Sequence, residues 1–187
     1  MRSLLRWCCV ICGMAFLSAC SESPEALLKD GHAAMVSLDD SVIDPGDSAL
    51  IAKGIASLET FCDRYPKNSH ADSALFMLGS LEGATGKNEL ATQSFLKLVE
   101  EYPQSKFRPK SIILAGHTYE AMRDYERARA CYERLIREYP DHEFVRGGSA
   151  QWLLDHLGQP PEEWLIPFGA DSAAARSDTL KTARRPG

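Results

Sequence analysis

The chain of 187 residues lacks the residue patterns that mark most enzymes and metal proteins. Its five histidines never fall at His-x-x-x-His or Glu-x-x-His spacing, and no Cys-x-x-Cys pair occurs after residue 20. The patterns Gly-x-x-x-x-Gly-Lys, Gly-x-Gly-x-x-Gly and Gly-x-Ser-x-Gly are also absent. The sequence therefore predicts a protein that is not an enzyme, with no metal, no cofactor and no small-molecule substrate.

Basic charge and long apolar runs are also scarce. The chain has 21 lysines and arginines against 26 acidic residues, a formal net charge of −5. No basic stripe offsets this balance, which argues against a nucleic-acid partner. The apolar run from Trp7 to Leu17 is shorter than the roughly 20 residues that span a bilayer. We therefore expect no transmembrane helix.

The first twenty residues, MRSLLRWCCVICGMAFLSAC, have the layout of a secretory signal peptide. Arg2 and Arg6 provide a charged start, and the apolar run follows. The run ends in Leu-Ser-Ala-Cys, residues 17–20, which resembles the lipobox of bacterial lipoproteins. That resemblance implies cleavage between Ala19 and Cys20, with S-diacylglycerol and N-acyl groups (palmitate) on Cys20. The alternative is an ordinary signal peptide cut near Ala19, with Cys20 incidental.

An acylated Cys20 would anchor the chain at a membrane. Each buried methylene contributes about 0.8 kcal/mol, so more than one acyl chain gives stable attachment. Ser21 stands where an Asp favours retention of enterobacterial lipoproteins at the inner membrane. The resemblance therefore implies the outer membrane of a Gram-negative bacterium, on its periplasmic face.

Few cysteines would remain after this processing. Cys8, Cys9 and Cys12 leave with the signal peptide, so only Cys62 and Cys131 keep free thiols. Two thiols about two repeat lengths apart make no disulfide framework. We interpret them as inert, half-buried thiols; a redox role is the alternative. Loss of Arg2 and Arg6 leaves 19 basic against 26 acidic residues, a net charge of −7.

A Tyr-Pro pair recurs at intervals of 37 residues, as Tyr65-Pro66, Tyr102-Pro103 and Tyr139-Pro140. Proline cannot extend a helix and pushes the preceding residue out of the α region. Each pair is therefore predicted to end a helix and to leave an aromatic ring on which the neighbouring unit packs.

Between the Tyr-Pro pairs, apolar residues follow helical spacing. The start signals are Asn68 or Ser69 for one helix and Asp124 for another, and Gly83 with Gly86 marks an end. Pro109 predicts a helix that begins a few residues later than its counterpart in the preceding repeat. Small and bulky residues recur 37 positions apart: Gly79, Ala91, Phe95 and Leu98, then Gly116, Ala128, Tyr132 and Leu135. Leu78 and Tyr119 are further bulky residues of the same two stretches.

The flanks follow the same design less closely. Upstream, Ser23 is a predicted N-cap with Pro24 at the first helical position, and Gly31 and Gly54 are candidate close-contact residues. Downstream, the stretch HEFVRGGSAQWLLDHLG has Leu153 where a crossing glycine would stand, as suits a terminal helix. Trp152 and Trp164 are expected to close that end of the core.

This pattern resembles the tetratricopeptide repeat (TPR), a helix–turn–helix of about 34 residues. The resemblance implies an all-α fold of antiparallel helical hairpins stacked as a short TPR solenoid, with two clear repeats (67–140), one degenerate repeat and one capping helix. The predicted domains are a signal peptide (1–19), a lipidated tether (20–23), a TPR-like domain (24–168) and a disordered tail (169–187). The tail ends in basic residues that could touch an anionic partner, although an idle tail is favoured.

In TPR proteins the concave face, formed by the first helix of each repeat, generally binds the partner. Carried over by position, the partner-binding groove would consist of Ser73, Phe76, Ser80, Lys110, Ile113, His117 and Glu120, with Phe76 and Ile113 as exposed apolar residues. Such a surface suits an extended peptide or a partner helix. It lacks the Lys/Asn set of carboxylate-clamp TPRs.

A lipobox combined with these repeats resembles the outer-membrane assembly lipoproteins of the BamD family and the TPR domain of the Tol-Pal-associated YbgF proteins. The resemblance implies a periplasmic adaptor for an insertase component or a nascent β-barrel protein, although full assembly lipoproteins have five repeats. The alternatives are a pilotin that carries a secretin, or a Tol-Pal-associated lipoprotein in envelope integrity. An enzyme or redox protein acting through Cys62 or Cys131 is the remaining alternative.

Overall fold

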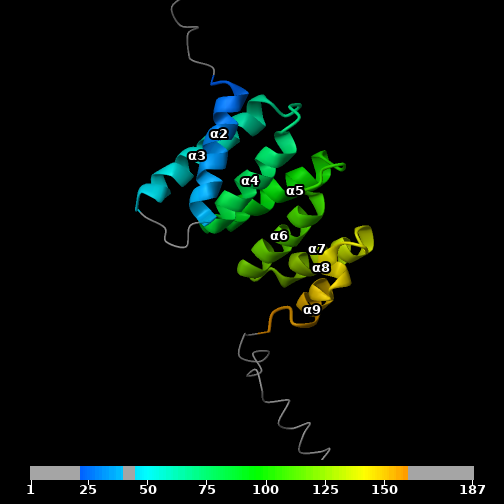
Figure 1. The fold of residues 1–187 in the computed structure, drawn as a ribbon. Helices are drawn as coiled ribbons and strands as arrows, with labels where there is room; N and C mark the ends of the chain where they lie inside the picture. Colours follow the sequence, from blue (N-terminus) through cyan, green and yellow to red (C-terminus); the bar gives the residue numbers. More distant parts are fainter. Residues whose placement is uncertain (1–21, 40–44, 160–187) are drawn as a thin grey trace, which may run out of the picture. The chain divides into compact units, whose positions relative to one another are not determined.

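In the computed structural model, which describes residues 22–39 and 45–159, every regular element is an α-helix. The helices, in chain order, are α2 (Pro24–Asp39), α3 (Pro45–Arg64), α4 (Ala71–Ala84), α5 (Asn88–Glu101), α6 (Arg108–Ala121), α7 (Tyr125–Glu138), α8 (Glu143–Arg146) and α9 (Ser149–Asp155) (Figure 1). The predicted fold class is confirmed. The signal peptide, Cys20, Trp164 and the tail lie outside the described residues.

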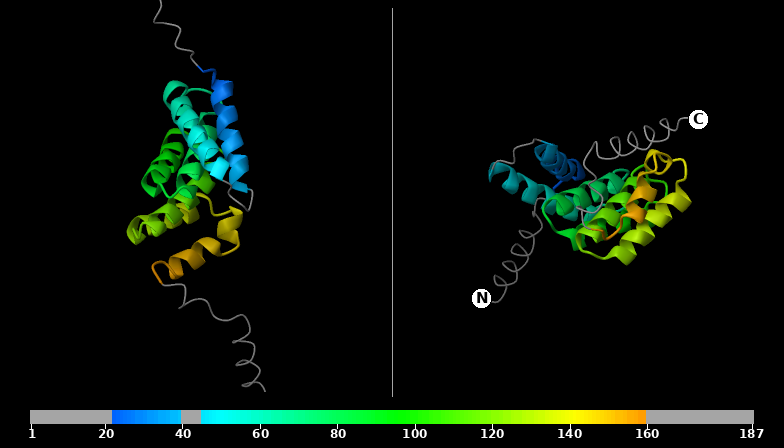
Figure 2. Two further views of the ribbon diagram at one scale, coloured as in Figure 1. Left: turned by 90° about the vertical axis from the view of Figure 1, so that its left-hand side faces the viewer. Right: turned by 90° about the horizontal axis from the view of Figure 1, so that it is seen from below.

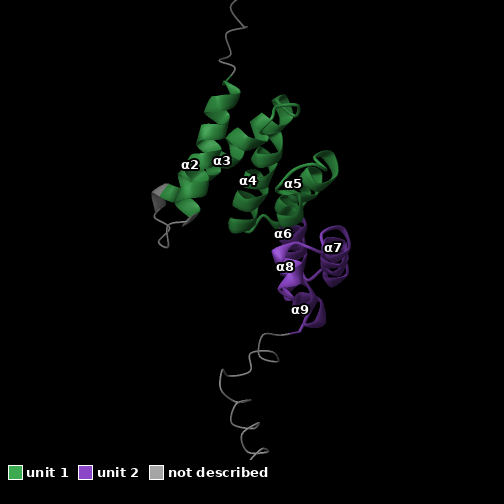
Figure 3. Ribbon diagram, turned by 45° about the vertical axis from the view of Figure 1, so that its right-hand side comes forward, with its two compact units in different colours: residues 1–111 green, residues 112–187 purple. Residues whose placement is uncertain are grey.

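The chain divides into two compact units, residues 1–111 and 112–187 (Figure 3). Helix α6 contains the boundary, between Ser111 and Ile112. Within the described ranges, no helix is both long and apolar enough to cross a membrane.

Helices α2 and α3 form the first hairpin and lie side by side in all three views (Figures 1 and 2). The Ser23 hydroxyl accepts a hydrogen bond from the Ala26 N–H at 3.2 Å, which confirms the predicted N-cap before Pro24. A Cβ on Gly54 would lie 2.3 Å from the Ala34 Cβ. Gly54 therefore allows the close helix contact that its position predicted.

The core of the first unit joins α2, α3, α4 and α5. Its fully buried side chains include Leu27, Leu58, Phe61, Leu81 and Leu98. Each helix contributes apolar residues three or four positions apart, so one stripe of every helix is removed from water. This burial, worth about 25 cal/mol per Å² of apolar surface, is the main favourable term for the unit.

Hairpins α4–α5 and α6–α7 repeat one another at the 37-residue interval. All four helices have 14 residues, and α6 begins at Arg108, 37 positions after Ala71 begins α4. The expectation of a late start for this helix is wrong, because Pro109 is the second residue of α6. A proline in the first turn lacks only an N–H that would have no helical partner.

The Tyr-Pro junctions end helices as predicted, and two of them bond to earlier segments. Tyr102 and Tyr139 are the C-cap residues of α5 and α7. The Tyr102 hydroxyl donates to the Pro66 carbonyl at 2.6 Å, and the Tyr65 hydroxyl donates to the Glu22 carbonyl at 3.3 Å. Within the first unit, these rings therefore join one helical pair to the segment before it.

A second periodic feature follows each Tyr-Pro pair. Asn68, Ser105 and His142 stand 37 residues apart, and each side chain accepts a hydrogen bond from the backbone N–H two residues later, at 2.9, 3.1 and 3.2 Å. Such local turns satisfy backbone donors before a helix begins. The junction is thus built by a side-chain acceptor as well as by proline.

In the second unit, α6 and α7 cross at Gly116, where an added Cβ would lie 2.4 Å from the Tyr132 ring. The Asp124 side chain accepts from the Arg127 N–H, so Asp124 is the N-cap of α7 as predicted. The predicted single capping helix is instead two short helices, α8 and α9. Gly148 breaks it with a φ of 78°, a conformation that favours glycine.

Candidate binding clefts

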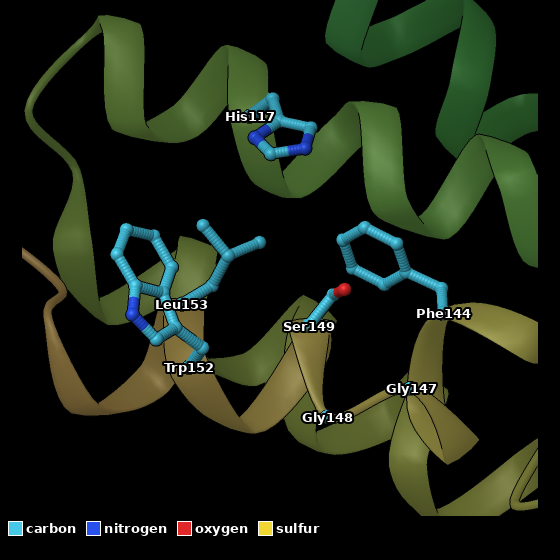
Figure 4. Close-up of a pocket in the computed structure, with 7 residues that line it drawn as sticks. All are labelled: His117, Phe144, Gly147, Gly148, Ser149, Trp152 and Leu153. Carbon is cyan, nitrogen blue, oxygen red and sulfur yellow. The ribbon is translucent and has the colours of Figure 1, made fainter. Parts of the chain in front are cut away.

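Two neighbouring clefts in the second unit are the candidate binding site. The first has a volume of about 460 Å³ and is lined by His117, Phe144, Gly147, Gly148, Ser149, Trp152 and Leu153 (Figure 4). The second, of about 290 Å³, is lined by Glu120, Tyr125, Trp152, Leu153, His156, Gly158 and Gln159. The volume of the first lies within the range of about 300–1,000 Å³ typical of ligand sites.

The break at Gly148 positions the cleft walls. It separates α8, which carries Phe144, from α9, which carries Ser149, Trp152 and Leu153. In Figure 4, His117 of α6 lies across the cleft from these residues. The wall is therefore mostly apolar and aromatic, with one imidazole and one hydroxyl among the lining side chains.

Trp152 is common to both clefts and is 44% exposed. Its indole stacks on the His156 ring, with centroids 4.4 Å apart and planes inclined by 22°. Trp152 was expected to close the end of the core. That expectation is wrong, because α9 presents the indole at the surface rather than beneath a covering helix.

His117 belongs to a hydrogen-bond network with Tyr132 and Glu120. The Tyr132 hydroxyl donates to the Glu120 carboxylate and lies 3.1 Å from His117 Nδ1, which is also 3.4 Å from Glu120 Oε2. Burial, together with the bond to Glu120, raises the pKa of the Tyr132 hydroxyl, so it stays protonated. Since that proton points to Glu120, the tyrosine oxygen is left as an acceptor that faces His117 Nδ1.

The network holds His117 at the cleft through Nδ1, while the role of Nε2 toward a ligand depends on the protonation form of the ring. The cleft can receive apolar side chains on Trp152, Leu153 and Phe144 and one polar group at His117.

The structure places the predicted groove residues in different surroundings. Ser73 and Ser80 donate their hydroxyls to carbonyls of their own helix, at 2.8 Å each. Phe76 was expected to be exposed, but it is half-buried, because its ring stacks on Phe107 at 4.9 Å, with Lys110 Nζ 5.5 Å from its ring centroid. Their use in partner binding stays a prediction.

Of the three groove residues in the second unit, two line the clefts and one does not. His117 lines the first cleft and Glu120 the second. Ile113 was expected to be exposed, but only 8% of it is accessible. That expectation is wrong because Ile113, like its neighbour Ile112, belongs to the buried side of α6.

Sequence reasoning missed Phe144, Ser149 and Tyr132 as parts of the site. The Gly147-Gly148 pair was a visible signal, because paired glycines in a helical pattern often mark a break. The tyrosine at 132, where the preceding repeat has Phe95, was the signal for a polar group inside the second hairpin.

A third cleft, of about 340 Å³, lies in the first unit. Its lining includes Glu82, Ser94, Cys62 and Lys97. The Ser94 hydroxyl donates to Glu82 Oε2 at 2.7 Å, and Glu82 is only 3% exposed. Burial raises the pKa of the Glu82 carboxyl, while the Ser94 bond opposes that change.

The two thiols are free and buried. Burial raises the pKa of Cys62 to about 12 and that of Cys131 to about 11. The thiolate is the reactive form, so both cysteines are poor nucleophiles at neutral pH. In the part of the chain that the structure describes, no three His, Cys, Asp or Glu side chains gather as a possible metal site.

Two family models of the tetratricopeptide repeat match the chain, one over residues 73–105 and the other over residues 109–142. The matches cover α4–α5 and α6–α7, the two hairpins that share the 37-residue spacing. The chain therefore contains tetratricopeptide repeats, a class of helical module that generally serves as a scaffold for protein–protein interaction. Comparison with curated proteins gave no significant match.

Proposed function

We propose that this chain is a non-enzymatic, periplasmic TPR adaptor lipoprotein, anchored in the outer membrane through acylated Cys20. Its partner is a protein of outer-membrane β-barrel assembly, either an insertase component or a nascent β-barrel protein. The observation that carries the adaptor role is a pair of matched repeats followed by aromatic-lined clefts in the second unit. The anchor and the location rest on the Leu-Ser-Ala-Cys sequence and Ser21.

The clefts suit a peptide better than a substrate undergoing chemistry. Trp152 and Phe144 provide apolar contact area, and aromatic residues are enriched where proteins bind each other. His117 adds one polar contact. The two buried thiols have raised pKa values, which argues against nucleophilic chemistry by either.

The anchor is tested by comparing the chain with its Cys20→Ser variant in cells fed a palmitate analogue. We expect label on the wild-type chain in the outer-membrane fraction, and neither label nor membrane retention for the variant. Mass spectrometry of the processed N-terminus identifies the modification. An unacylated first residue in the wild-type chain would disprove the lipoprotein proposal.

The partner is tested by photo-crosslinking in intact cells, with p-benzoylphenylalanine replacing Trp152. The matched control carries the same group at Glu133, an exposed residue of α7 in the same unit. We expect an adduct with an insertase component or a nascent β-barrel protein from position 152 only. A secretin adduct would favour the pilotin alternative, and equal labelling from both positions would contradict binding in the clefts.

A further inference from the structure

The clefts around Trp152 raise the question of what covers them when no partner is bound. An indole that is 44% exposed, between two neighbouring clefts, is a costly surface to leave in water. The end of α9 provides a candidate, because the described chain stops beside the second cleft. Gly158 and Gln159 are the last described residues, and both line it.

The path of the chain at this point is defined by one backbone angle and two contacts. Gly158 has a φ of 80°, and a Cβ there would lie 3.3 Å from the Tyr125 ring. The Gln159 side-chain amide donates to the Asp155 carbonyl at 3.2 Å. The chain thus leaves α9 turned toward Tyr125, at the edge of the cleft and not away from it.

The sequence that follows has the right chemistry. Residues 160–187 contain five large apolar side chains, and four of them, Trp164, Leu165, Ile166 and Phe168, fall within five positions. Pro160 and Pro161 favour an extended backbone over a helix. At up to about 3.3 Å per extended residue, Trp164 can reach about 17 Å from Gln159. Gln159 itself lines the second cleft, and that cleft shares Trp152 and Leu153 with the first.

We infer that residues 164–168, Trp-Leu-Ile-Pro-Phe, dock into the clefts of the same chain, against Trp152, Leu153 and Phe144. The segment covers the exposed indole and acts as an internal occupant that a protein partner must displace. This occupancy concerns the same surface as the proposed function, but it needs no partner and is testable without one. A second copy of the chain donating the same segment is the competing arrangement.

Photo-crosslinking of the purified full chain tests the inference. p-Benzoylphenylalanine replaces Trp164 in one variant and Leu180, the remaining large apolar residue, in the control. At low micromolar concentration we expect an adduct within the monomer, from position 164 to peptides of α6, α8 or α9, and none from position 180. An adduct found only in a covalent dimer, or equal labelling from 164 and 180, would overturn the inference.

Hydrogen exchange gives an independent measurement without a bulky probe. A variant with Trp164, Leu165, Ile166 and Phe168 all changed to Ser changes no residue of α6–α9, and an unchanged helical circular-dichroism signal shows that these helices still form. We expect amides of α9 to exchange several-fold faster in this variant than in the wild-type chain, and Leu180→Ser to have no effect. Unchanged α9 exchange in the four-residue variant would overturn self-docking.

The two proposals fail in different ways. Self-docking is judged on the purified chain alone, whereas the adaptor role is judged on adducts from Trp152 in cells. If both hold, the four-residue variant gives more partner adduct from position 152 than the wild-type chain, by several-fold. A decrease in that adduct would contradict displacement of the segment by the partner.

Discussion

Hairpins α4–α5 and α6–α7 share length, spacing and helix crossing, yet they bury polar groups at different places. At the crossing, Phe95 packs on Gly79 in one hairpin and Tyr132 packs on Gly116 in the other. The Tyr132 hydroxyl bonds to Glu120 and His117. The positions 37 residues before Glu120 and His117 hold Gly83 and Ser80, so a hydroxyl at position 95 would have neither a carboxylate nor an imidazole as its partner.

Away from the crossing, it is the first hairpin that buries a polar pair and the second that lacks it. Glu82 and Ser94 form a buried polar pair in α4–α5, and the equivalent positions in α6–α7 hold Tyr119 and Cys131. Small and large residues at the crossing thus determine the hairpin, while the polar positions around it vary. The tyrosine at position 132 contacts His117, which lines a cleft, whereas Phe95 at the equivalent position has no hydroxyl to make such a contact.

The largest expected effect comes from filling the crossings. In Gly116→Ala the new Cβ would lie 2.4 Å from Tyr132 Cε1, whereas in Gly79→Ala it would lie 2.8 Å from Phe95 Cε1. Both rings are almost fully buried. Overpacking lowers the free energy of unfolding by about 1–3 kcal/mol, and the better helix propensity of Ala returns up to about 1 kcal/mol.

Urea unfolding of the two variants measures this difference. We expect both midpoints to fall, with the larger decrease for Gly116→Ala. Equal midpoints for wild type and Gly116→Ala would show that the α6–α7 crossing accommodates an added methyl group without loss of stability.

A reciprocal exchange at the crossing ring tests the polar difference directly. Phe95→Tyr buries a hydroxyl beside Ser80 and Gly83, and an unsatisfied buried hydroxyl costs about 1–3 kcal/mol. Tyr132→Phe removes two hydrogen bonds, but Glu120 and His117 are partly exposed and regain water, so we expect a loss of about 1 kcal/mol. Urea unfolding measures both, and NMR of His117 detects the lost Nδ1 bond in Tyr132→Phe. A stabilised Phe95→Tyr would contradict the comparison.

The 37-residue interval was sufficient to predict the hairpins, because glycine and bulky residues alternate at the crossings and proline ends the helices. Gly79 and Gly116 could be placed from this interval, and Gly54 stands one interval before Ala91. Gly31 lies off the interval and could be named only as a candidate close-contact residue of a degenerate repeat. The clefts could not, since they depend on how α8 and α9 turn at Gly148 after the repeat pattern has ended. Ile113 was misjudged for a related reason: position in a repeat gives the helix face, but burial depends on the neighbouring side chains.

The helix ends provide a third contrast. Gly86 ends α4 with a φ of 76°, and its equivalent at the end of α6 is Arg123, with a φ of 60°. The next residues, Lys87 and Asp124, bond back to Glu82 and Tyr119 carbonyls at 2.8 and 2.9 Å, so the two ends have the same geometry. A left-handed conformation costs a residue other than glycine about 1 kcal/mol or more.

Arg123→Gly is therefore expected to raise the free energy of unfolding by about 1 kcal/mol, and Gly86→Ala to lower it by a similar amount. Nothing lies within 4 Å of a Cβ on Gly86, so that variant tests conformation without a steric clash. Thermal unfolding of the two variants checks both signs. A destabilised Arg123→Gly would assign Arg123 a role beyond ending the helix.

The smallest expected effect concerns the buried carboxyl group of Glu82, whose equivalent position in the second hairpin holds Tyr119. Its pKa is raised mainly by burial, so in the folded chain it binds a proton more tightly than in the unfolded chain. Between the ordinary glutamate pKa of about 4.3 and the raised value, the folded state holds more protons, and stability falls as pH rises. Above the raised pKa, the full penalty for a buried charge remains.

Glu82→Gln keeps an acceptor for the Ser94 hydroxyl and removes the charge, so it should be more stable than wild type at pH 8 and equal to it at pH 4. Urea midpoints at the two pH values check this, with Glu133→Gln on the exposed face of α7 as the matched control. If Glu82→Gln and wild type lose stability in parallel from pH 4 to pH 8, another group is responsible for that pH dependence.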